Sequence, residues 1–292
     1  MERKHAFLLG VYKCPEYVEI LLNMLISERS NIYIHVNKRN WEDFKHLVDK
    51  YKDKNVTFIH EVEINWGGSS FMDSVMSLIR ISLENKENVY FHLITGQDVL
   101  TKPLSSFFSF FENTSKSYIS YHIMDKKEVK FRFKTFHFFD LLNINYGKRD
   151  FKRMIETFSW MVQMMIPFKN QKLPFKTMYQ GSPWWSLHRN AIEYCYNYIV
   201  NNNIMSRFRN TFAPDESLFH TILMDASTFP LENNNLRYIV WDQSYIGGQK
   251  LLQENDFDTL ISSETFFARK VDLNDSDSRL LIDKISKYIC SK

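Results

Sequence analysis

Short apolar segments alternate with amphipathic ones through the first hundred residues, and this alternation constrains the fold more than any other feature. The apolar runs have strand length, and the segments between them carry apolar residues at helical spacing. The runs are His5–Val11, Asn31–Val36, Val56–Ile59 and Val89–Thr95, and the helical segments are Tyr17–Ser27, Trp41–Tyr51 and Ser70–Glu84. This order predicts an α/β fold with a Rossmann-type, mostly parallel sheet flanked by helices on both faces.

Polar residues follow three of the predicted strands. They are Tyr12-Lys13, His35-Val36-Asn37-Lys38 and Thr95-Gly96-Gln97-Asp98. Ligands of parallel sheets bind beyond the carboxyl ends of the strands, so we expect the binding groups at these exits. His35 and His92 lie within strands and are predicted to be core histidines.

The second half of the chain is less regular. Its predicted strands are Tyr118–Tyr121, Val129–Phe133, Gly181–Leu187 and Arg237–Trp241, and its predicted helices are Asp150–Ile166, Ala191–Val200, Pro214–Met224 and Asn255–Ser262. No linker, repeat or low-complexity tract separates the halves. We therefore predict a single domain over residues 1–292, with a nucleotide-binding half (1–115) and an acceptor and catalytic half (116–292).

The charge of the chain argues against a nucleic-acid partner. Its net charge is only +3, whereas duplex binding needs basic residues concentrated on one face. The densest basic run is Lys126–Lys134, where cations alternate with Phe131 and Phe133. This alternation is typical of a strand with one solvated face. A pocket for an anionic group is the alternative.

Cysteine usage and hydropathy bear on location. Cys14, Cys195 and Cys290 are odd in number and show no metal-ligand spacing, which favours a reducing compartment. No signal peptide and no run of about 20 apolar residues occurs. The segment Phe158–Phe168 is apolar and Met-rich. It predicts a core helix, with peripheral membrane contact as the alternative. We expect a soluble, cytoplasmic protein that either stays free or lies at the inner face of the membrane.

The familiar phosphate and metal motifs are absent. The sequence has no GxGxxG after a strand, no GxxxxGK[ST] and no HExxH. Asp256-Phe257-Asp258 has the spacing with which many nucleotide-sugar transferases hold a divalent metal, but it falls inside a predicted helix. We therefore expect no metal and no other cofactor.

Seven blocks of sequence, in order along the chain, resemble the core-2/I-branching β-1,6-N-acetylglucosaminyltransferase family and the related xylosyltransferases. Three match the family's signature blocks: Gly181–Leu187 (GSPWWSL), Ala213–Phe219 (APDESLF) and Phe266–Lys270 (FFARK). Four support them: Asn31–Val36, Asn65–Gly68, Leu93–Asp98 and Leu236–Trp241. The resemblance covers residues 5 to 275, and it implies a GT-A-like fold and inverting, metal-independent transfer from a UDP-sugar.

The resemblance assigns the catalytic base to Glu216. Inversion needs a carboxylate that takes the acceptor hydroxyl's proton as it attacks. Pro214 suits the first turn of a helix, so Glu216 is predicted near a positive helix end. A purely stabilising first-turn acid is the alternative. Asp215, its neighbour, is predicted to bind the acceptor.

Further residues are assigned by the same resemblance. Lys270, Arg269 and Lys250 are expected to bind the UDP diphosphate, since fixed cations replace a metal there; a solvated surface charge is the alternative for each, and for Lys250 above all. The donor nucleotide and sugar are assigned to Asp98, Trp66 and Asn37, and the acceptor to Trp241 besides Asp215. Asn37 departs from the family's Asp, Asp98 has a turn cap as its alternative, and for both tryptophans the alternative is a core position. Trp185 and Tyr238 are predicted to be core residues.

These matches predict transfer of N-acetylglucosamine from UDP-GlcNAc to a glycan hydroxyl, by analogy the 6-hydroxyl, in β linkage. The same enzyme with UDP-xylose or UDP-glucuronate, a non-catalytic glycan-binding protein on this scaffold, and a metal-dependent transferase are the alternatives. The chain lacks the anchor, stem and disulfides of animal members. This favours a bacterial version that extends or branches a surface polysaccharide or a lipid-linked saccharide. Its oligomeric state does not follow from the sequence.

Overall fold

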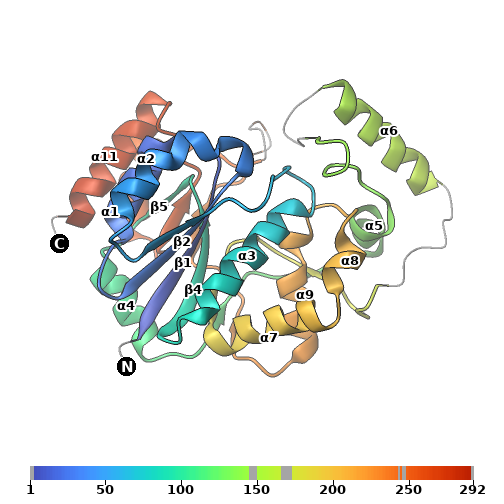
Figure 1. Ribbon diagram of the computed structural model, residues 1–292, viewed down its shortest axis with the longest axis horizontal. Coiled ribbons are helices and arrows are strands. Elements are labelled where there is room, and N and C mark those ends of the chain that lie inside the picture. The colour runs from blue at the N-terminus through green and yellow to red at the C-terminus, as the bar shows by residue number, and fades with distance from the viewer. Residues whose placement is uncertain (1–2, 145–149, 166–172, 243, 245–247, 291–292) are drawn as a thin grey trace.

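The computed structural model describes residues 3–144, 150–165, 173–242, 244 and 248–290. Its centre is a twisted sheet, one half of which consists of parallel strands (Figure 1). These are β1 (Lys4–Val11), β2 (Ser30–Val36), β3 (Val56–Ile59) and β4 (Asn88–Thr95), in the order β3-β2-β1-β4. β1 and β2 are buried along nearly their whole length because helices cover both faces of the sheet. The four predicted strands are confirmed, and so are the buried positions of His35 and His92.

Helices form a layer on each face of the sheet (Figure 1). One layer consists of α1 (Pro15–Leu25), α2 (Trp41–Tyr51), α4 (Leu104–Glu112) and α11 (Ser276–Cys290). The other consists of α3 (Ser70–Glu84), α7 (Arg189–Asn201) and α9 (Leu218–Ala226). Leu21, Phe107 and Ile282 belong to the first core, whereas Leu78 and Ile192 belong to the second. The α/β layers predicted from the periodicity are therefore confirmed.

Three short strands from the second half of the chain extend the sheet beyond β4. They are β9 (Ser186–His188), β6 (Ser117–Tyr118) and β10 (Leu231–Glu232). β9 is antiparallel to β4 and to β6, and β10 is parallel to β6. The sheet is thus mostly parallel, as the predicted GT-A-like fold requires. The predicted division at residue 115 stays a prediction.

A second, three-stranded sheet lies at the exit of β4. It consists of β11 (Arg237–Ile239), β12 (Phe267–Arg269) and β5 (Asp98–Leu100), in that order. β12 runs antiparallel to β5, and their register places Arg269 opposite Asp98. Because β5 begins three residues after β4 ends, this sheet brings the C-terminal part of the chain to a strand exit of the central sheet.

The prediction of a strand at Val129–Phe133 was wrong. Residues 126–134 form α5 (Lys126–Val129) and a π-helical turn, η2 (Lys130–Lys134). Asp125 caps α5 by accepting a hydrogen bond from the Glu128 backbone N–H at 2.8 Å. Arg132 and Phe133 are both buried, although alternation in a strand would have placed them on opposite faces.

The remaining elements are short except for one helix. They are η1 (Lys38–Asn40), β7 (His122–Ile123), α6 (Phe151–Met165), β8 (Tyr179–Gln180), α8 (Ile204–Phe208), η3 (Pro214–Glu216), η4 (Glu254–Asp256) and α10 (Phe257–Ser262). The helix predicted at Asp150–Ile166 is α6, and residues 166–168 of the apolar segment lie outside the described residues. Within the described ranges, no helix has the length and apolar character that crossing a bilayer demands.

Candidate active site

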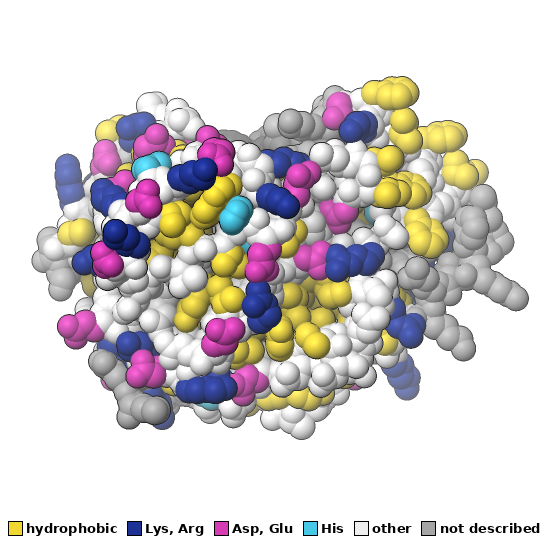
Figure 2. All heavy atoms as spheres, in the orientation of Figure 1, with side chains coloured by type: hydrophobic (Ala, Val, Ile, Leu, Met, Phe, Trp, Pro, Cys, Tyr) yellow, Lys and Arg dark blue, Asp and Glu magenta, His cyan; other side chains and the backbone are white. Residues whose placement is uncertain are grey.

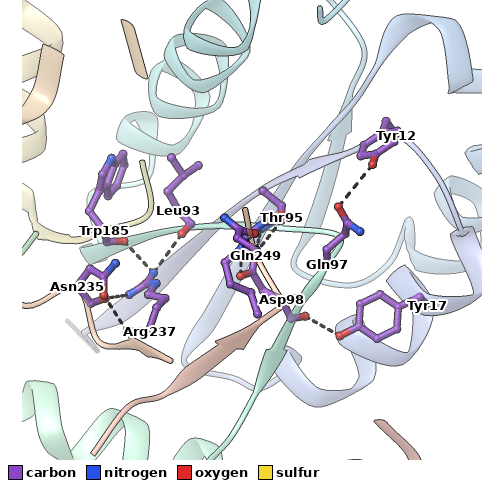
Figure 3. A network of polar contacts seen from close by, with 11 residues as sticks. Tyr12, Tyr17, Leu93, Thr95, Gln97, Asp98, Trp185, Asn235, Arg237 and Gln249 are labelled. Atoms are coloured by element: carbon purple, nitrogen blue, oxygen red, sulfur yellow. Dashed lines mark hydrogen bonds and ion pairs between the residues drawn. The ribbon is translucent and has the colours of Figure 1, made fainter. Parts of the chain in front are cut away.

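A buried ion pair between Asp98 and Arg269 joins the two sheets at the exit of β4, and Figure 3 shows Asp98 beside Thr95 at this exit. The Asp98 carboxylate accepts hydrogen bonds from the Thr95 backbone N–H at 2.5 Å and the Thr95 hydroxyl at 2.8 Å. Arg269 Nη1 lies 3.1 Å from both of its oxygens. Asp98 is completely buried, and its carboxylate is held by Thr95 and Arg269 at the strand exit. Its predicted donor contact stays a prediction.

Arg269 is fixed by more than its ion pair. Its Nε donates to Gln249 at 3.0 Å, and its guanidinium carbon lies 3.4 Å from the ring centroid of the buried Trp184. Burial lowers the pKa of Arg269, although the Asp98 carboxylate opposes that effect. Nη2 makes no hydrogen bond within the described part of the chain, and is the atom through which Arg269 can reach an anion.

Lys270 and Lys13 add two cations at the same place. Burial, and then the nearby charges of Lys13 and Arg269, lower the pKa of the half-buried Lys270. Lys13 follows β1 and pairs with Asp272 at 2.6 Å, which raises its pKa against the effect of burial. Lys270 itself forms no ion pair with any described carboxylate. Lys13, Arg269 and Lys270 thus gather at one place, which we call the cationic corner; the sequence pointed to it through the exit Tyr12-Lys13 without assigning a role to Lys13.

Lys250 lies near this corner but has its own partner. Its Nζ is 3.4 Å from both carboxylate oxygens of Asp256, the first acid of the Asp-Phe-Asp triplet. Asp256 also accepts from the backbone of Gln253 and caps η4, which explains why this triplet serves local structure. Across the described residues, no three His, Cys, Asp or Glu side chains gather as a metal site would need. Metal independence stays a prediction.

Glu216 ends the short helix η3, two residues before α9 begins, so the predicted helix starting at Pro214 is divided. Its Oε2 accepts from Arg132 Nη1 at 2.8 Å. Its Oε1 has no hydrogen-bond partner among the described residues, and the side chain is only partly buried. One oxygen is therefore held in place while the other is available to accept a proton.

Arg132 is a site residue that the sequence analysis missed. Besides Glu216 it contacts Glu128 at 3.4 Å, and the oxygen of the Gln180 amide accepts from its Nη2 at 2.6 Å. Its guanidinium carbon also lies 5.1 Å from the centroid of the Phe212 ring. The spacing of Glu128 and Arg132, four residues apart, was the available signal, since it indicates a helix and not a strand.

Backbone hydrogen bonds from two other blocks, Gly181–Leu187 and Asn65–Gly68, hold the segment around Glu216. The Gly181 N–H donates to the Glu216 carbonyl at 3.0 Å. On the other side, the Ala213 N–H donates to the Gly67 carbonyl at 2.9 Å, in the turn that carries Trp66. The position of Glu216 is thus fixed by chain segments from three different parts of the sequence.

Gly181 approaches its neighbours too closely for any side chain. A Cβ there would lie 1.7 Å from the Ser120 carbonyl oxygen and 2.9 Å from His220 Nε2. We expect Gly181→Ala to lower the free energy of unfolding by about 1–3 kcal/mol or more, because backbone must shift. Denaturant unfolding measures this, with Gly10→Ala as the control, since its Cβ would meet only the Phe71 side chain, at 3.1 Å. Equal losses in both variants would contradict the expectation.

Burial, and then the neighbouring Glu216 carboxylate, raise the pKa of Asp215 to about 7. The folded value exceeds that of an unfolded Asp, about 4. Between pH 4 and 7 the folded protein therefore holds a proton that the unfolded chain has lost, and stability falls as pH rises through this window. We expect Asp215→Asn to raise Tm by about 2–4 °C at pH 8.5 and to leave it unchanged at pH 4. If wild type and Asp215→Asn have the same Tm at pH 8.5 as well as at pH 4, the predicted loss of stability with rising pH is wrong.

The other predicted ligand residues divide into buried and exposed ones. Asn37 is buried, and its amide bonds the backbone of Ile64 through both Nδ2 (3.1 Å) and Oδ1 (3.3 Å). Trp66 and Trp241 are exposed, so the alternative of core positions is wrong for both. The predicted core positions hold for Trp185, which is fully buried, and for Tyr238, which packs partly buried against the first core.

The block Gly181–Leu187 connects the carboxylate to the cations. Gly181 bonds the backbone of Glu216, and Trp184 stacks on Arg269. Three residues of chain span at most about 11 Å. The structure therefore brings Glu216, Asp215, Arg269 and Lys270 to one region, with Lys250 beside it.

A second buried network, centred on Arg237, lies beside this region and is seen at the left of Figure 3. Arg237 donates to Ser186 Oγ at 2.8 Å and to the carbonyls of Trp185, Leu93 and Asn235 at 2.9, 3.1 and 2.6 Å. Burial lowers its pKa to about 9. Arg237 thus fixes the end of the Gly181–Leu187 block against β4 and does not face a ligand.

A carboxylate with a free oxygen, beside cations at the strand exits of an α/β sheet, is an arrangement suited to group transfer from an anionic leaving group. The family model of the core-2/I-branching enzymes matches residues 5–267. The chain belongs to this family. It is a glycosyltransferase, which uses a sugar donor and a glycan acceptor, and the family resemblance noted in the sequence is confirmed.

Comparisons with individual proteins add little to this. No curated protein has a sequence that matches the chain. Apo mouse xyloside xylosyltransferase 1 is 12% identical, with a TM-score of 0.42, over 91% of this chain and 97% of that one. A putative glucose-1-phosphate thymidylyltransferase from Bacillus anthracis is 12% identical, with a TM-score of 0.31, over 71% and 85%. Scores this low say nothing about the donor or the acceptor of this chain.

Proposed function

We propose that the chain is an inverting glycosyltransferase that moves N-acetylglucosamine from UDP-GlcNAc to a glycan 6-hydroxyl in β linkage. Glu216 is its general base, and no metal takes part. The observation that carries the proposal is the Glu216 carboxylate, whose Oε2 is held by Arg132 at 2.8 Å while Oε1 has no partner among the described residues. The acceptor is a glycan or a lipid-linked saccharide.

The reaction needs two groups to act together. The acceptor oxygen attacks the anomeric carbon as its proton passes to Glu216 Oε1, and the bond from that carbon to the diphosphate oxygen breaks with its electrons leaving on UDP. Lys270 and Arg269 Nη2 stabilise that departing charge, and the nearby Lys13 adds a third positive charge; the proximity of these three cations supports this step. Lys250 joins them only if its pair with Asp256 opens.

The remaining assignments belong to the proposal. The exposed Trp66 lies on the turn that bonds Ala213, so it can cover the donor beside Glu216, and the exposed Trp241 can offer its ring to the acceptor sugar. Asp215, protonated up to about pH 7, can donate a hydrogen bond to an acceptor oxygen. Division into a nucleotide-binding half and an acceptor half, and a cytoplasmic location, go with the same proposal.

UDP release from UDP-GlcNAc, UDP-xylose and UDP-glucuronate, with a panel of glycan acceptors and with and without EDTA, tests the proposal. We expect UDP-GlcNAc to be used fastest and EDTA to have no effect. If UDP-xylose or UDP-glucuronate is used fastest, the proposed donor is wrong and the proposed mechanism stands. Loss of activity in EDTA would overturn metal independence, and glycan binding without turnover or UDP binding would favour the non-catalytic alternative.

Lys270→Met provides a separate test of the cationic corner. Methionine keeps the length of the side chain and removes its charge, while Arg269 and Lys13 remain. We expect the Kd for UDP to rise about tenfold or more, as for the loss of one charge-assisted contact worth 1.5–3 kcal/mol. Calorimetric titration with UDP measures this, and Lys287→Met is the control, since it removes one positive charge from an exposed position on α11. Unchanged UDP affinity would remove Lys270 from the site.

A further inference from the structure

The helix α6 turns its apolar side chains outward. Phe151, Phe158 and Met165 are 74%, 70% and 86% exposed, although side chains of this size are normally buried in a core. Figure 2 shows hydrophobic side chains gathered over this helix at the upper right of the molecule. The prediction that the segment beginning at Phe158 is a core helix is therefore wrong for its described part.

The exposed residues form one continuous stripe. At 3.6 residues per turn they lie within about 120° of the helix circumference. We call this stripe the α6 face, and it consists of Phe151, Met154, Ile155, Phe158, Met161 and Met165. Helices of globular proteins direct such a stripe toward the core. Here it is directed away from the rest of the chain.

Polar contacts fix this orientation. Glu156, on the opposite side of α6, is completely buried; its carboxylate lies 2.8 Å from His137 Nδ1 and accepts from the Phe138 N–H at 3.0 Å. Gln163 bonds both the N–H and the carbonyl of Phe136, at 2.7 and 3.0 Å. Because the polar side of the helix is bonded to the protein, rotation of the α6 face into the core would break these contacts.

The stretch of sequence that contains α6 is strongly positive. Residues 126–176 contain twelve Lys or Arg and four Asp or Glu, a net charge of +8, whereas the rest of the chain has 25 against 30, a net charge of −5. Lys152 Nζ donates to the Leu142 carbonyl at 3.0 Å and Lys130 Nζ to the Met164 carbonyl at 2.7 Å. In the described part of the chain neither lysine has a carboxylate partner. Each end of the helix thus has a lysine without a carboxylate partner among the described residues.

We propose that α6 docks the protein on an anionic lipid surface. The α6 face enters the boundary between headgroups and acyl chains, and Lys130 and Lys152 lie at the level of the lipid phosphates. A helix of 15 residues is about 22 Å long, too short to span a bilayer but suited to lie in its plane. A second copy of the chain fits this face less well, because pairing would bring two segments of charge +8 together.

Docking at α6 also bears on the orientation of Glu216. The π-helical turn η2 carries both Lys130, which bonds α6, and Arg132, which bonds Glu216. These two residues are two positions apart, so a membrane that holds α6 also lies near the carboxylate. An acceptor carried by a membrane lipid would be presented there. The docking itself requires neither the donor nor the mechanism proposed above.

Flotation with lipid vesicles tests the docking on the full chain, without donor or acceptor. We expect the protein to float with vesicles of phosphatidylcholine and phosphatidylglycerol (7:3), and at least tenfold less with phosphatidylcholine alone or in 0.5 M NaCl. The double variant Phe151→Glu/Phe158→Glu should lose at least tenfold in bound fraction. Its control is Val200→Glu/Leu280→Glu, at apolar positions 52% and 50% exposed on α7 and α11, which should bind like wild type.

Three outcomes would overturn the proposal. One is wild-type protein that does not float with anionic vesicles, a result that does not depend on any variant folding. Another is equal loss of binding in both double variants. The third is that light scattering shows a wild-type dimer that does not bind vesicles, and that Phe151→Glu/Phe158→Glu converts this dimer to a monomer. Circular dichroism and Tm establish that each variant is folded before its binding is compared.

Discussion

Glu216→Gln should lower kcat on the preferred donor by about 10²–10⁴, the usual contribution of a general base. The amide has the shape of the carboxylate and can still accept from Arg132, so the 2.8 Å contact and the local fold are retained. It lacks the basic oxygen that takes the acceptor's proton. Because the proposal assigns the diphosphate to Lys270 and Arg269 and not to Glu216, the Kd for UDP should stay within about twofold of wild type.

The measurement is steady-state transfer to the acceptor, with UDP binding followed separately by calorimetry. Glu264→Gln is the matched control, since Glu264 is exposed and lies on the loop between α10 and β12. It should leave both kcat and UDP affinity unchanged. A Glu216→Gln enzyme with wild-type kcat would refute the base assignment and leave Glu216 the stabilising role considered from the sequence.

The first half of the fold could be predicted because its local signals agree with one another. β1 and β4 are apolar runs of strand length, and α2 and α3 carry a clear helical period. Such patterns depend on residues close in sequence. The strand predicted at Val129–Phe133 failed for the same reason, because an alternating pattern over five residues outweighed the Asp125 cap and the Glu128–Arg132 spacing.

The site could be predicted only where motifs named its residues. Glu216, Lys270 and Arg269 lie in signature blocks, and the structure brings them to one region. Arg132 and Lys13 lie in no such block. Their roles depend on long-range contacts, with Glu216 84 residues away and Asp272 259 residues away, and no pattern within a single sequence reports such pairings.

The α6 face shows a different limit. The sequence predicts a helix at residues 150–166 and an apolar, Met-rich segment from Phe158, but it does not say which side of the helix meets the protein. The answer depends on Glu156 and Gln163, which find polar partners in residues 136–138. An amphipathic pattern therefore predicts a helix and its stripe, while the direction of the stripe is set by what the other side contacts.

Asp98→Asn should be the most destabilising substitution at the site. Asp98 is completely buried, and Arg269 beside it is 5% exposed and held against Trp184. Removing the carboxylate charge leaves the guanidinium in the interior without compensation, which costs about 3–5 kcal/mol in buried ion pairs of this kind. Asparagine can still accept from the Thr95 N–H, so the expected loss comes from charge and not from the turn.

Two further variants separate this explanation from a general effect of mutation. Asp98→Asn combined with Arg269→Met removes both charges, and it should recover most of the lost free energy of unfolding because no unpaired charge remains. Glu42→Gln breaks the exposed pair with Lys45 and should cost less than about 1 kcal/mol. Urea unfolding of all three variants gives the comparison. Two results would show that the pair does not hold the two sheets together: Asp98→Asn lowers the free energy of unfolding no more than Glu42→Gln does, or the double variant is less stable than Asp98→Asn alone. In either case Trp184 and Gln249, and not Asp98, hold Arg269 in position for the diphosphate.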